Sequence, residues 1–388
     1  MTRARALLLL LAAALAAAPA CSQRGGDRYS RKEAQRSLRK LEAPGLLLGE
    51  FRPTQVVDGD TIKVEGLDAS LRLLGVDAEE TFKNEADRRA VEASWDAYWQ
   101  SKQAGSKRPV KAASPLGEVA KDWARRWFAD VRTIRIERDH PAEIRDRYER
   151  YLAYVIAEKG GRSLNYNIEL VRAGMSPYFP KYGNSRRFHQ DFLEAQAEAK
   201  AARRGIWQPG ALAYPDYPER EAWWTARGDF VDAFRREGEG QPSYIDITHV
   251  NAMSQLEEHL GKQVHVLGTI GEVRRPGRGP ARATLSRRRG GDLPLIFFDL
   301  DVLAMSGVDP WRGEFVVVTG VPTFYENKRT KRKQLQIVIE RASQIKLSPV
   351  PGLTPPSAGY TPEAAPSSAH PAGHTSPTLS GAQPGGTP

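Results

Sequence analysis

The chain contains one cysteine in 388 residues, at position 21. A single cysteine can form no internal disulfide, so the fold must be stabilised by packing. Long apolar runs are also scarce, and the main one, residues 7–18, is too short to cross a bilayer. These shortages exclude a disulfide-stabilised scaffold and argue against a membrane-spanning helix in this stretch.

Residues 1–20 have the composition of a cleavable leader. Basic residues precede the apolar run, and Ala18-Pro19-Ala20 fits a cleavage site of the A-x-A type. Cys21 follows at once, which resembles a bacterial lipoprotein signal, although Ala18 stands where the usual signal has leucine. We expect lipidation of Cys21 and an exported protein anchored by lipid at the cell envelope, on its periplasmic or extracellular face. Ordinary secretion with an incidental cysteine is the alternative.

The charge balance favours a polyanionic partner. Lys and Arg number 57 against 47 Asp and Glu, so the formal net charge is +10. Such a charge suits nucleic acid or an anionic membrane, and the alternative is a basic protein that is merely soluble. Hydrophobic content of 40% and charged content of 27% are ordinary for globular proteins. The length allows two or three domains.

Residues 54–81 are the most informative stretch. Asp58-Gly59, between two runs of strand composition, is the strongest short hairpin signal. A third strand, residues 71–76, carries Arg72 within an apolar run and leads into Asp77 and Glu80. In a small antiparallel sheet these segments gather carboxylates around the arginine. That arrangement costs free energy unless a cation or an ionisable substrate lies among them.

The motifs of this stretch resemble the catalytic core of the staphylococcal nuclease (thermonuclease) family. They are DGDT at residues 58–61 and RLLGVDAEET at residues 72–81. Further family-like motifs follow in order at residues 146–155, 167–174 and 195–207. The resemblance covers about residues 51–208. It implies an α+β fold built on a five-stranded OB-type barrel that carries helices.

The resemblance implies Ca²⁺-dependent hydrolysis of phosphodiester bonds in DNA or RNA. Asp60, Asp77 and the backbone carbonyl of Ala78 would bind Ca²⁺, with Asp58 supporting the site. Carboxylate and carbonyl oxygens are the ligands that suit this ion. Glu80 would be the general base that orients or deprotonates the attacking water. Without the resemblance, the Asp58 to Asp60 segment would be interpreted as a polar turn.

Arginines would bind the substrate phosphate in this scheme. Arg72 and Arg150 would hold it and stabilise charge in the transition state, because a planar guanidinium matches phosphate oxygens. Arg147 and Tyr148 lie where the family binds a terminal phosphate. For each arginine the alternative is a surface ion pair, which is a poor explanation for Arg72 inside an apolar strand.

Two residues depart from the family pattern. Glu79 replaces a proline and is expected to add a carboxylate and loosen the turn. Ala78 replaces threonine or serine and loses a hydroxyl but keeps the carbonyl. The family's substrate-contacting tyrosine is matched by either Tyr178 or Tyr182.

The remaining elements are expected from period and capping signals. A helix over residues 114–128 should begin with Ser114 as N-cap and Pro115 in its first position. The other expected elements are a helix at 86–100, strands at 131–137 and 150–157, and helices at 162–172 and 185–204.

A second β-rich unit follows the first. Five strands, at residues 263–273, 281–287, 293–299, 314–321 and 335–347, with a helix near 301–306, have the OB order. Basic residues and aromatics accompany them, as in OB folds that bind single strands. The alternative places the aromatics in the core and the cations in solvated loops. The basic residues are Arg274, Arg275, Arg278, Arg282, Arg287, Arg288, Arg289, Lys328, Arg329, Lys331, Arg332 and Lys333, and the aromatics are Phe297, Phe298, Phe324 and Tyr325.

These features predict the domain organisation. An insertion at 84–113 lies after Glu80 and either borders the active site or, as we favour slightly, decorates the surface. The tether is a spacer or pairs with anionic headgroups, and the tail is too poor in core-forming residues to fold. The expected boundaries are leader 1–20, tether 21–48, nuclease-like domain 49–208, linking helix 209–243, OB-like domain 244–347 and Pro/Ser/Gly-rich tail 348–388.

The sequence therefore predicts an exported Ca²⁺-dependent nuclease with a nucleic-acid-binding OB domain and no obligate protein partner. A non-catalytic nucleic-acid-binding protein is the first alternative, and retention of the acids and arginines named above argues against it. An envelope protein that uses both OB units for protein or glycan contacts is the second alternative. Only the exported context supports it.

Overall fold

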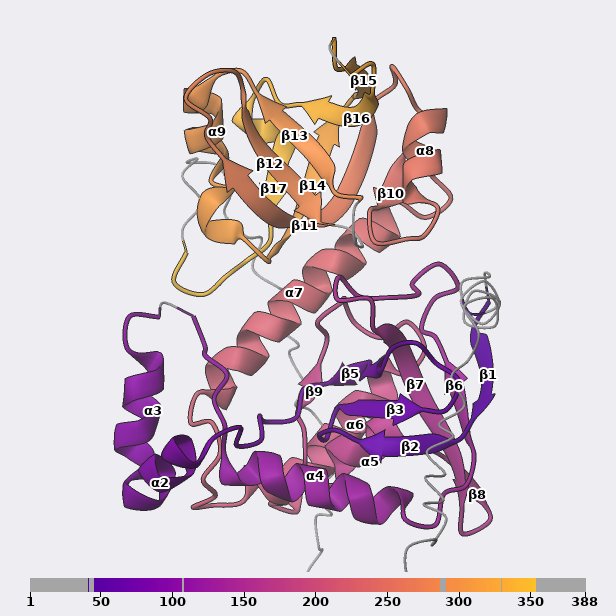
Figure 1. Cartoon of the computed structure of the whole chain (residues 1–388), viewed down its shortest axis with the longest axis vertical. Coiled ribbons are helices and arrows are strands. Elements are labelled where there is room, and N and C mark those ends of the chain that lie inside the picture. The colour runs from indigo at the N-terminus through magenta and orange to yellow at the C-terminus, as the bar shows by residue number, and fades with distance from the viewer. Residues whose placement is uncertain (1–40, 42–44, 107, 287–290, 329, 354–388) are drawn as a thin grey trace, which may run out of the picture.

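The computed structural model describes residues 41, 45–106, 108–286, 291–328 and 330–353. Within them strands and helices form two domains joined by one long helix (Figure 1). The expected mixed α+β class is confirmed. The leader 1–20, Cys21, most of the tether and most of the tail lie outside the described residues.

The first domain is built on a sheet in the order β1-β6-β7-β4-β3-β2, with β8 paired to β7. Its central strand β7 is antiparallel to β6 and parallel to β4, and its side chains are buried from Tyr151 to Ala157. Two short strands, β5 and β9, pair beside this sheet. The strands are β1 (Leu47–Phe51), β2 (Pro53–Val56), β3 (Thr61–Val64), β4 (Leu71–Leu73), β5 (Gly75–Val76), β6 (Ile134–Glu137), β7 (Tyr151–Lys159), β8 (Arg162–Asn165) and β9 (Tyr178–Phe179).

Helices surround this sheet, and their starts follow local capping chemistry. The Ser114 side chain accepts the N–H of Gly117 and Pro115 occupies the first turn of α4, as predicted. The predicted helix at 86–100 is instead two helices, because Ser94 ends the first and caps the second by accepting the N–H of Ala97. The helices are α2 (Glu85–Ala93), α3 (Trp95–Gln103), α4 (Pro115–Phe128), α5 (Tyr166–Arg172), α6 (His189–Ala201) and the short η1 (Gly205–Trp207).

Two other predicted helix starts were wrong. Residues 162–165 form β8, because they extend the hairpin with β7 before the chain turns into α5. The helix expected from residue 185 begins at His189, because Ser185 is engaged in hydrogen bonds with Tyr154 and Asp139.

The long helix α7 (Tyr217–Glu237) connects the domains and packs on both. Its first half places Trp224 against Phe179 of the first domain. Its second half places Phe230 and Phe234 in a cluster with Phe315 of the second domain. The apolar contacts at both ends make the helix part of both cores.

The second domain is a sheet in the order β15-β16-β13-β12-β11-β14-β17, with β10 beside β11. A helix, α9, lies between β13 and β14, as predicted. Its elements are β10 (Tyr244–Asp246), α8 (Ala252–Glu258), β11 (Val264–Arg274), β12 (Ala281–Ser286), β13 (Leu293–Phe297), α9 (Leu300–Ser306), η2 (Asp309–Trp311), β14 (Phe315–Gly320), β15 (Pro322–Glu326), β16 (Lys333–Val338), η3 (Ala342–Gln344) and β17 (Ile345–Leu347).

The predicted last strand, residues 335–347, was wrong as a single element. It is two strands, β16 and β17, separated by a turn in which the Gln344 side chain accepts the N–H groups of Glu340 and Arg341. The hairpin strand β15, which pairs with β16, was not predicted. In the described part of the chain, no helix is both long and apolar enough to cross a membrane.

Candidate active site

The predicted hairpin turn lies against the acidic segment that follows β5. Strand β3 pairs with β4, so Thr61 lies opposite Arg72, and the turn before β3 carries Asp60. Gly59 in this turn comes so close to the next segment that an added Cβ would lie 2.7 Å from the Cβ of Ala78. A side chain at position 59 would therefore push the two segments apart.

A backbone kink directs the acidic segment toward the turn. Gly75 has a φ of +73°, a conformation that favours glycine, and an added Cβ would lie 2.5 Å from the Phe192 ring. The predicted continuous strand 71–76 is therefore interrupted between β4 and β5. After the kink, the backbone N–H of Asp77 donates to the Ser176 hydroxyl at 2.8 Å, which fixes the start of the segment.

Arg72 is the centre of the site and bridges two buried carboxylates. One terminal nitrogen, Nη1, pairs with Asp60, and the other, Nη2, lies 2.8 Å from Oδ1 of Asp77. All three residues are buried. Burial alone would lower the pKa of Arg72, but the charges of Asp60 and Asp77 outweigh it and raise that pKa. The arginine thus has the specific anionic partners that an apolar strand requires.

The insertion supplies a second cation to the same acid. Lys111, near its C-terminal end, forms an ion pair with Oδ1 of Asp77. Burial would raise the pKa of Asp77, but Lys111 and then Arg72 outweigh it and lower that pKa to about 2. The insertion therefore borders the site and is more than the surface elaboration that we favoured.

The oxygen atoms of this cluster fit a hard cation such as Ca²⁺. Arg72 and Lys111 both contact Oδ1 of Asp77, and Oδ2 has no hydrogen bond within the described part of the chain. Burial and then the charge of Asp60 raise the pKa of Asp58 to about 7, so negative charge is crowded here. Asp60, Asp77 and the carbonyl of Ala78 are the residues that would hold the ion.

Glu80 differs from these acids because its carboxylate is open to water. Its side chain is 37% exposed, and it forms an ion pair with the exposed Lys83 at 3.0 Å. Its backbone is held, since its carbonyl accepts the N–H of Ser114 at 3.0 Å at the start of α4. A fixed backbone with a solvent-facing carboxylate suits a residue that positions water.

Glu79 does not loosen the turn, contrary to the sequence prediction. Its carboxylate is buried and accepts hydrogen bonds from the Ser114 hydroxyl, from the N–H of Tyr214 at 2.8 Å and from the Tyr217 hydroxyl at 2.9 Å. Burial raises its pKa, and these hydrogen bonds oppose the shift. Glu79 thus ties the active-site segment to α4 and to the start of α7.

Arg150 lies in a neighbouring part of the site with its own acid. Its Nε and Nη2 lie 2.9 Å and 2.7 Å from Oδ2 of Asp146. The same carboxylate, through Oδ1, accepts the backbone N–H of Tyr148 at 2.9 Å. Tyr148 is 65% exposed, and its ring lies near the guanidinium groups of Arg147 and Arg150. Of the predicted phosphate-binding residues, Arg147, Tyr148 and Arg150 therefore lie together with Tyr148 exposed, whereas Arg72 is buried.

The charges of both parts of the site act on Tyr182, whereas Tyr178 has other neighbours. Burial raises the pKa of Tyr182, and the charges of both Arg72 and Arg150 act on it. Its hydroxyl has no hydrogen-bond partner within the described residues. The Tyr178 hydroxyl instead contacts His189 at 3.0 Å and accepts the N–H of Ser185 at 2.9 Å. Tyr182 is therefore the better match for a substrate-contacting tyrosine.

Lys181 is a further cation whose pKa responds to the charges of the site. Burial, and next the positive charge of Arg72, lower its pKa to about 8. The charges of Asp77, Lys111 and Arg150 also act on it. Sequence reasoning missed Lys181, Lys111 and Asp146. The sequence offered one signal for each residue. Lys181 precedes the candidate Tyr182, Lys111 lies in a basic stretch, and Asp146 precedes the candidate Arg147.

The second domain carries its expected aromatics in two different settings. Phe297 is buried in the core, whereas Phe298, Phe324 and Tyr325 are exposed. Phe324 and Tyr325 are on β15, at the end of the domain away from α7 (Figure 1). Lys328, Lys331, Arg332 and Lys333 are exposed beside them, Arg274 and Arg275 pair with Glu272 and Asp309, and Arg287, Arg288, Arg289 and Arg329 lie outside the described residues.

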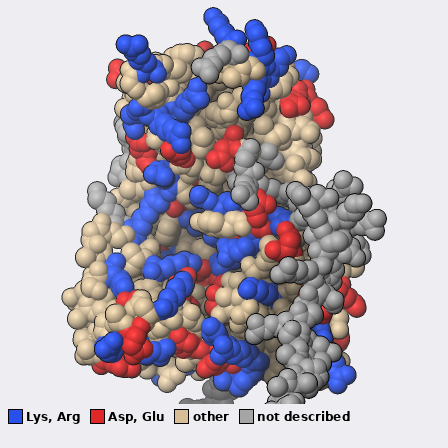
Figure 2. All heavy atoms as spheres, viewed as in Figure 1, with Lys and Arg blue, Asp and Glu red and all other residues tan. Residues whose placement is uncertain are grey.

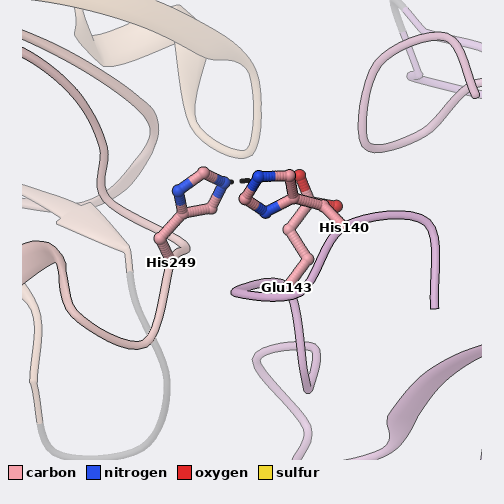
Figure 3. A group of neighbouring side chains, drawn as sticks. All are labelled: His140, Glu143 and His249. Carbon is pink, nitrogen blue, oxygen red and sulfur yellow. Dashed lines mark ion pairs between the residues drawn. The ribbon is translucent and has the colours of Figure 1, made fainter. Parts of the chain in front are cut away.

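A separate cluster of His140, Glu143 and His249 joins the domains (Figure 3). Their candidate ligand atoms lie within 4.8 Å of one another. However, the imidazole rings stack at 4.5 Å with only 12° between their planes, so their in-plane lone pairs do not converge on one ion. Glu143 already pairs with Arg235 at 3.3 Å and with His249 at 3.5 Å. The geometry is that of an ionic contact between domains.

Comparisons with known proteins agree with the first-domain motifs. The family model described as staphylococcal nuclease homologue matches residues 70–209, which include Arg72, Asp77, Glu80 and Arg150 but begin after Asp60. An uncharacterized protein of Methanocaldococcus jannaschii is 32% identical over 155 residues, covering 39% of this chain and 69% of that protein. The thermonuclease of Staphylococcus intermedius is 28% identical over 158 residues, covering 40% of this chain and 73% of that protein.

Proposed function

The chain belongs to the staphylococcal nuclease homologue family, and we propose that it is a Ca²⁺-dependent nuclease that hydrolyses phosphodiester bonds of DNA, RNA or both. One observation carries the proposal. Arg72 joins Asp60 and Asp77 in a buried cluster, and Glu80, three residues after Asp77, has a water-accessible carboxylate. Phosphodiester hydrolysis needs charge neutralisation at phosphorus and an activated water, and this cluster offers residues for both.

In this proposal Glu80 orients the attacking water and takes its proton. Arg72 and Arg150 bind the phosphate. Each guanidinium keeps a nitrogen that makes no hydrogen bond to the acids described above. In Arg72 this nitrogen is Nε, which is buried without a hydrogen-bond partner among the described residues, and in Arg150 the contacts to Asp146 use only Nε and Nη2. Tyr182, whose hydroxyl has no hydrogen-bond partner among the described residues, would donate to the same phosphate. Ca²⁺ held by Asp60 would supply charge neutralisation and a bound water.

The decisive experiment is digestion of plasmid DNA and of a structured RNA by the whole chain. We expect cleavage with Ca²⁺ and none after addition of the chelator EGTA. Binding without cleavage under both conditions would contradict the proposal and favour the non-catalytic alternative. Equal cleavage with and without chelator would contradict only the Ca²⁺ requirement.

We further propose that the second domain binds single-stranded nucleic acid through β15 and the basic hairpin that follows it. Exposed Phe324 and Tyr325 beside exposed lysines support this assignment. Bases of any identity stack on such rings, while the cations follow the phosphates.

Export and lipid anchoring through Cys21 remain a proposal based on the leader sequence. Detergent-phase partition of the parent and of Cys21→Ser tests it. We expect the parent in the detergent phase and the variant in the aqueous phase. Equal partition would contradict anchoring.

A further inference from the structure

We propose that the second domain completes the active-site cleft by forming one wall of a pocket for a single nucleotide next to the phosphodiester that is cleaved. The inference rests on the proposed nuclease function and adds a substrate subsite to it. It assigns the second domain a role at the reaction site, in addition to strand binding at its distant β15 hairpin.

A cavity of about 250 Å³ lies between the two domains. Tyr148, Lys181 and Tyr182 line it from the first domain, and Thr269 and Ser286 line it from the second. Thr269 and Ser286 are paired neighbours on β11 and β12, so their positions are set by the sheet. Figure 2 shows Lys and Arg side chains gathered around the middle of this face, between the two domains.

The cavity adjoins the Arg150 part of the candidate active site. Asp146, Arg147 and Tyr148 line it, and Oδ2 of Asp146 lies 2.7 Å from Nη2 of Arg150. The charges of Arg72 and Arg150 also act on Lys181 and Tyr182, which line the cavity as well. A nucleotide in the cavity would therefore lie next to Arg150, one of the proposed phosphate-binding groups.

The acids that line the cavity already have partners within the protein. Glu143 pairs with Arg235, and Asp146 pairs with Arg150. Asp246 accepts hydrogen bonds from the N–H of Thr248 at 2.9 Å and from its hydroxyl at 2.6 Å. The lining also carries the cations Arg145, Arg147, Lys181 and Arg227, which outnumber these acids, so the cavity does not present an excess of negative charge to a ligand.

Some cations that line the cavity have no ion-pair partner among the described residues, and some hydrogen-bond donors have no acceptor there. Within the described residues no ion pair involves Lys181 or Arg147, although both line the cavity. Arg227, which is 93% buried and pairs with Glu314 through Nη2, leaves its Nε without a hydrogen-bond partner among those residues. The Tyr182 hydroxyl is likewise buried without a hydrogen-bond partner among those residues. Buried donors without partners are uncommon, and an anionic ligand would satisfy them.

The other lining groups fit the uncharged part of a nucleotide. Tyr148 and Phe315 supply flat apolar rings, and bases stack on aromatic side chains. The hydroxyls of Thr269 and Ser286 can each donate and accept hydrogen bonds, as base edges require. The volume of about 250 Å³ is just below the roughly 300–1,000 Å³ of pockets for drug-sized ligands. It therefore suits one nucleotide and not a longer stretch of strand.

The experiment measures equilibrium binding of deoxyadenosine 5′-monophosphate, 2-deoxyribose 5-phosphate and inorganic phosphate to the whole chain by calorimetry. We expect the parent to bind the nucleotide at least tenfold more tightly than the two base-free probes. Thr269→Phe should fill the cavity and reduce nucleotide affinity to that of the base-free probes. Thr319→Phe is the matched control, since Thr319 is a half-buried threonine on the adjacent strand β14 that does not line the cavity.

Two outcomes would overturn the pocket. One is equal affinity of the parent for the nucleotide and for phosphate, a comparison that needs no variant. The other is parent-like nucleotide binding by folded Thr269→Phe. A mononucleotide contains no phosphodiester linkage to cleave, so these outcomes do not depend on nuclease activity. Failure of the pocket and failure of the proposed function can therefore be distinguished.

Discussion

Lys111 from the insertion forms an ion pair with Asp77, on the same Oδ1 atom that Arg72 contacts. The carboxylate proposed to bind Ca²⁺ thus has a competing cation from its own chain. The Lys111 side chain is 43% exposed, so it has room to move away when the ion binds.

Replacing this lysine should strengthen Ca²⁺ binding. We expect Lys111→Met to raise Ca²⁺ affinity by on the order of tenfold, because the ion would no longer compete with a resident charge. Lys111→Arg, which keeps the charge, is the control and should resemble the parent. Calcium titration calorimetry measures this without reference to cleavage. Unchanged affinity in Lys111→Met would show that the ion pair does not compete.

Glu80→Gln should lower the cleavage rate by roughly 10²-fold or more, because the variant cannot accept a proton from water. The side chain is solvent-facing, so stability and Ca²⁺ affinity should stay close to those of the parent. Cleavage of a labelled oligonucleotide at saturating Ca²⁺ gives the rate. Glu85→Gln, an exposed acid in the first turn of α2, is the control. A Glu80→Gln chain as active as the parent would remove Glu80 as the base.

Glu79→Ala should lower the free energy of unfolding by about 2–4 kcal/mol, because it leaves buried donors of Ser114, Tyr214 and Tyr217 without an acceptor. Glu79→Gln keeps one acceptor oxygen and should lose less. Urea denaturation of both variants and the parent provides the measurement. If the alanine variant matched the parent in stability, the hydrogen bonds at Glu79 would not contribute to the free energy of unfolding.

The contact between His249 and Glu143 should make stability depend on pH. Burial lowers the pKa of His249, but Glu143 and Asp246 outweigh it and raise that pKa above its usual value. Protonated His249 therefore contributes stability that is fully present below its unfolded pKa of about 6.5. The contribution is lost as pH rises through the higher folded value. The groups facing His249 are His140, Glu143, Arg186, Arg235 and Asp246.

Thermal unfolding of the parent from pH 6 to 9 should show this loss, and His249→Gln should reduce it. The control is His259→Gln, at the end of α8 in the same domain. Burial and then His249 lower the pKa of His140 to about 4, so His140 stays neutral across this range. Parallel stability curves for the parent and His249→Gln would contradict the assignment.

Phe324→Ala and Tyr325→Ala should each weaken binding of single-stranded DNA by about tenfold through loss of base stacking. Lys331→Met should instead reduce the slope of log affinity against log salt by about one. Met305→Ala, which removes an exposed apolar side chain on α9, is the control. Binding is measured with EGTA present to prevent cleavage. If neither Phe324→Ala nor Tyr325→Ala changed the affinity for single-stranded DNA, the assignment of the strand-binding surface to β15 would be wrong.

The sequence by itself determined the local features of the first domain. Asp58-Gly59 predicted the hairpin turn, and Ser114 with Pro115 predicted the start of α4, because turns and caps depend on residues a few positions apart. The acids beside Arg72 were found in the same way, within one short stretch. Errors of element length arose where a side chain ended an element early, as Ser94 and Gln344 do.

Only the tertiary structure decided which distant residues complete the site. Lys111 reaches Asp77 from the insertion, and the segment after β9 brings Lys181 under the influence of the charge of Arg72. No local pattern specifies such an arrangement. Glu79 was misjudged for the same reason, since its hydrogen-bond partners Tyr214 and Tyr217 come from the start of α7. The cavity between the domains exists because α7 packs on both cores. Its shape depends on that packing, which sequence periodicity does not encode.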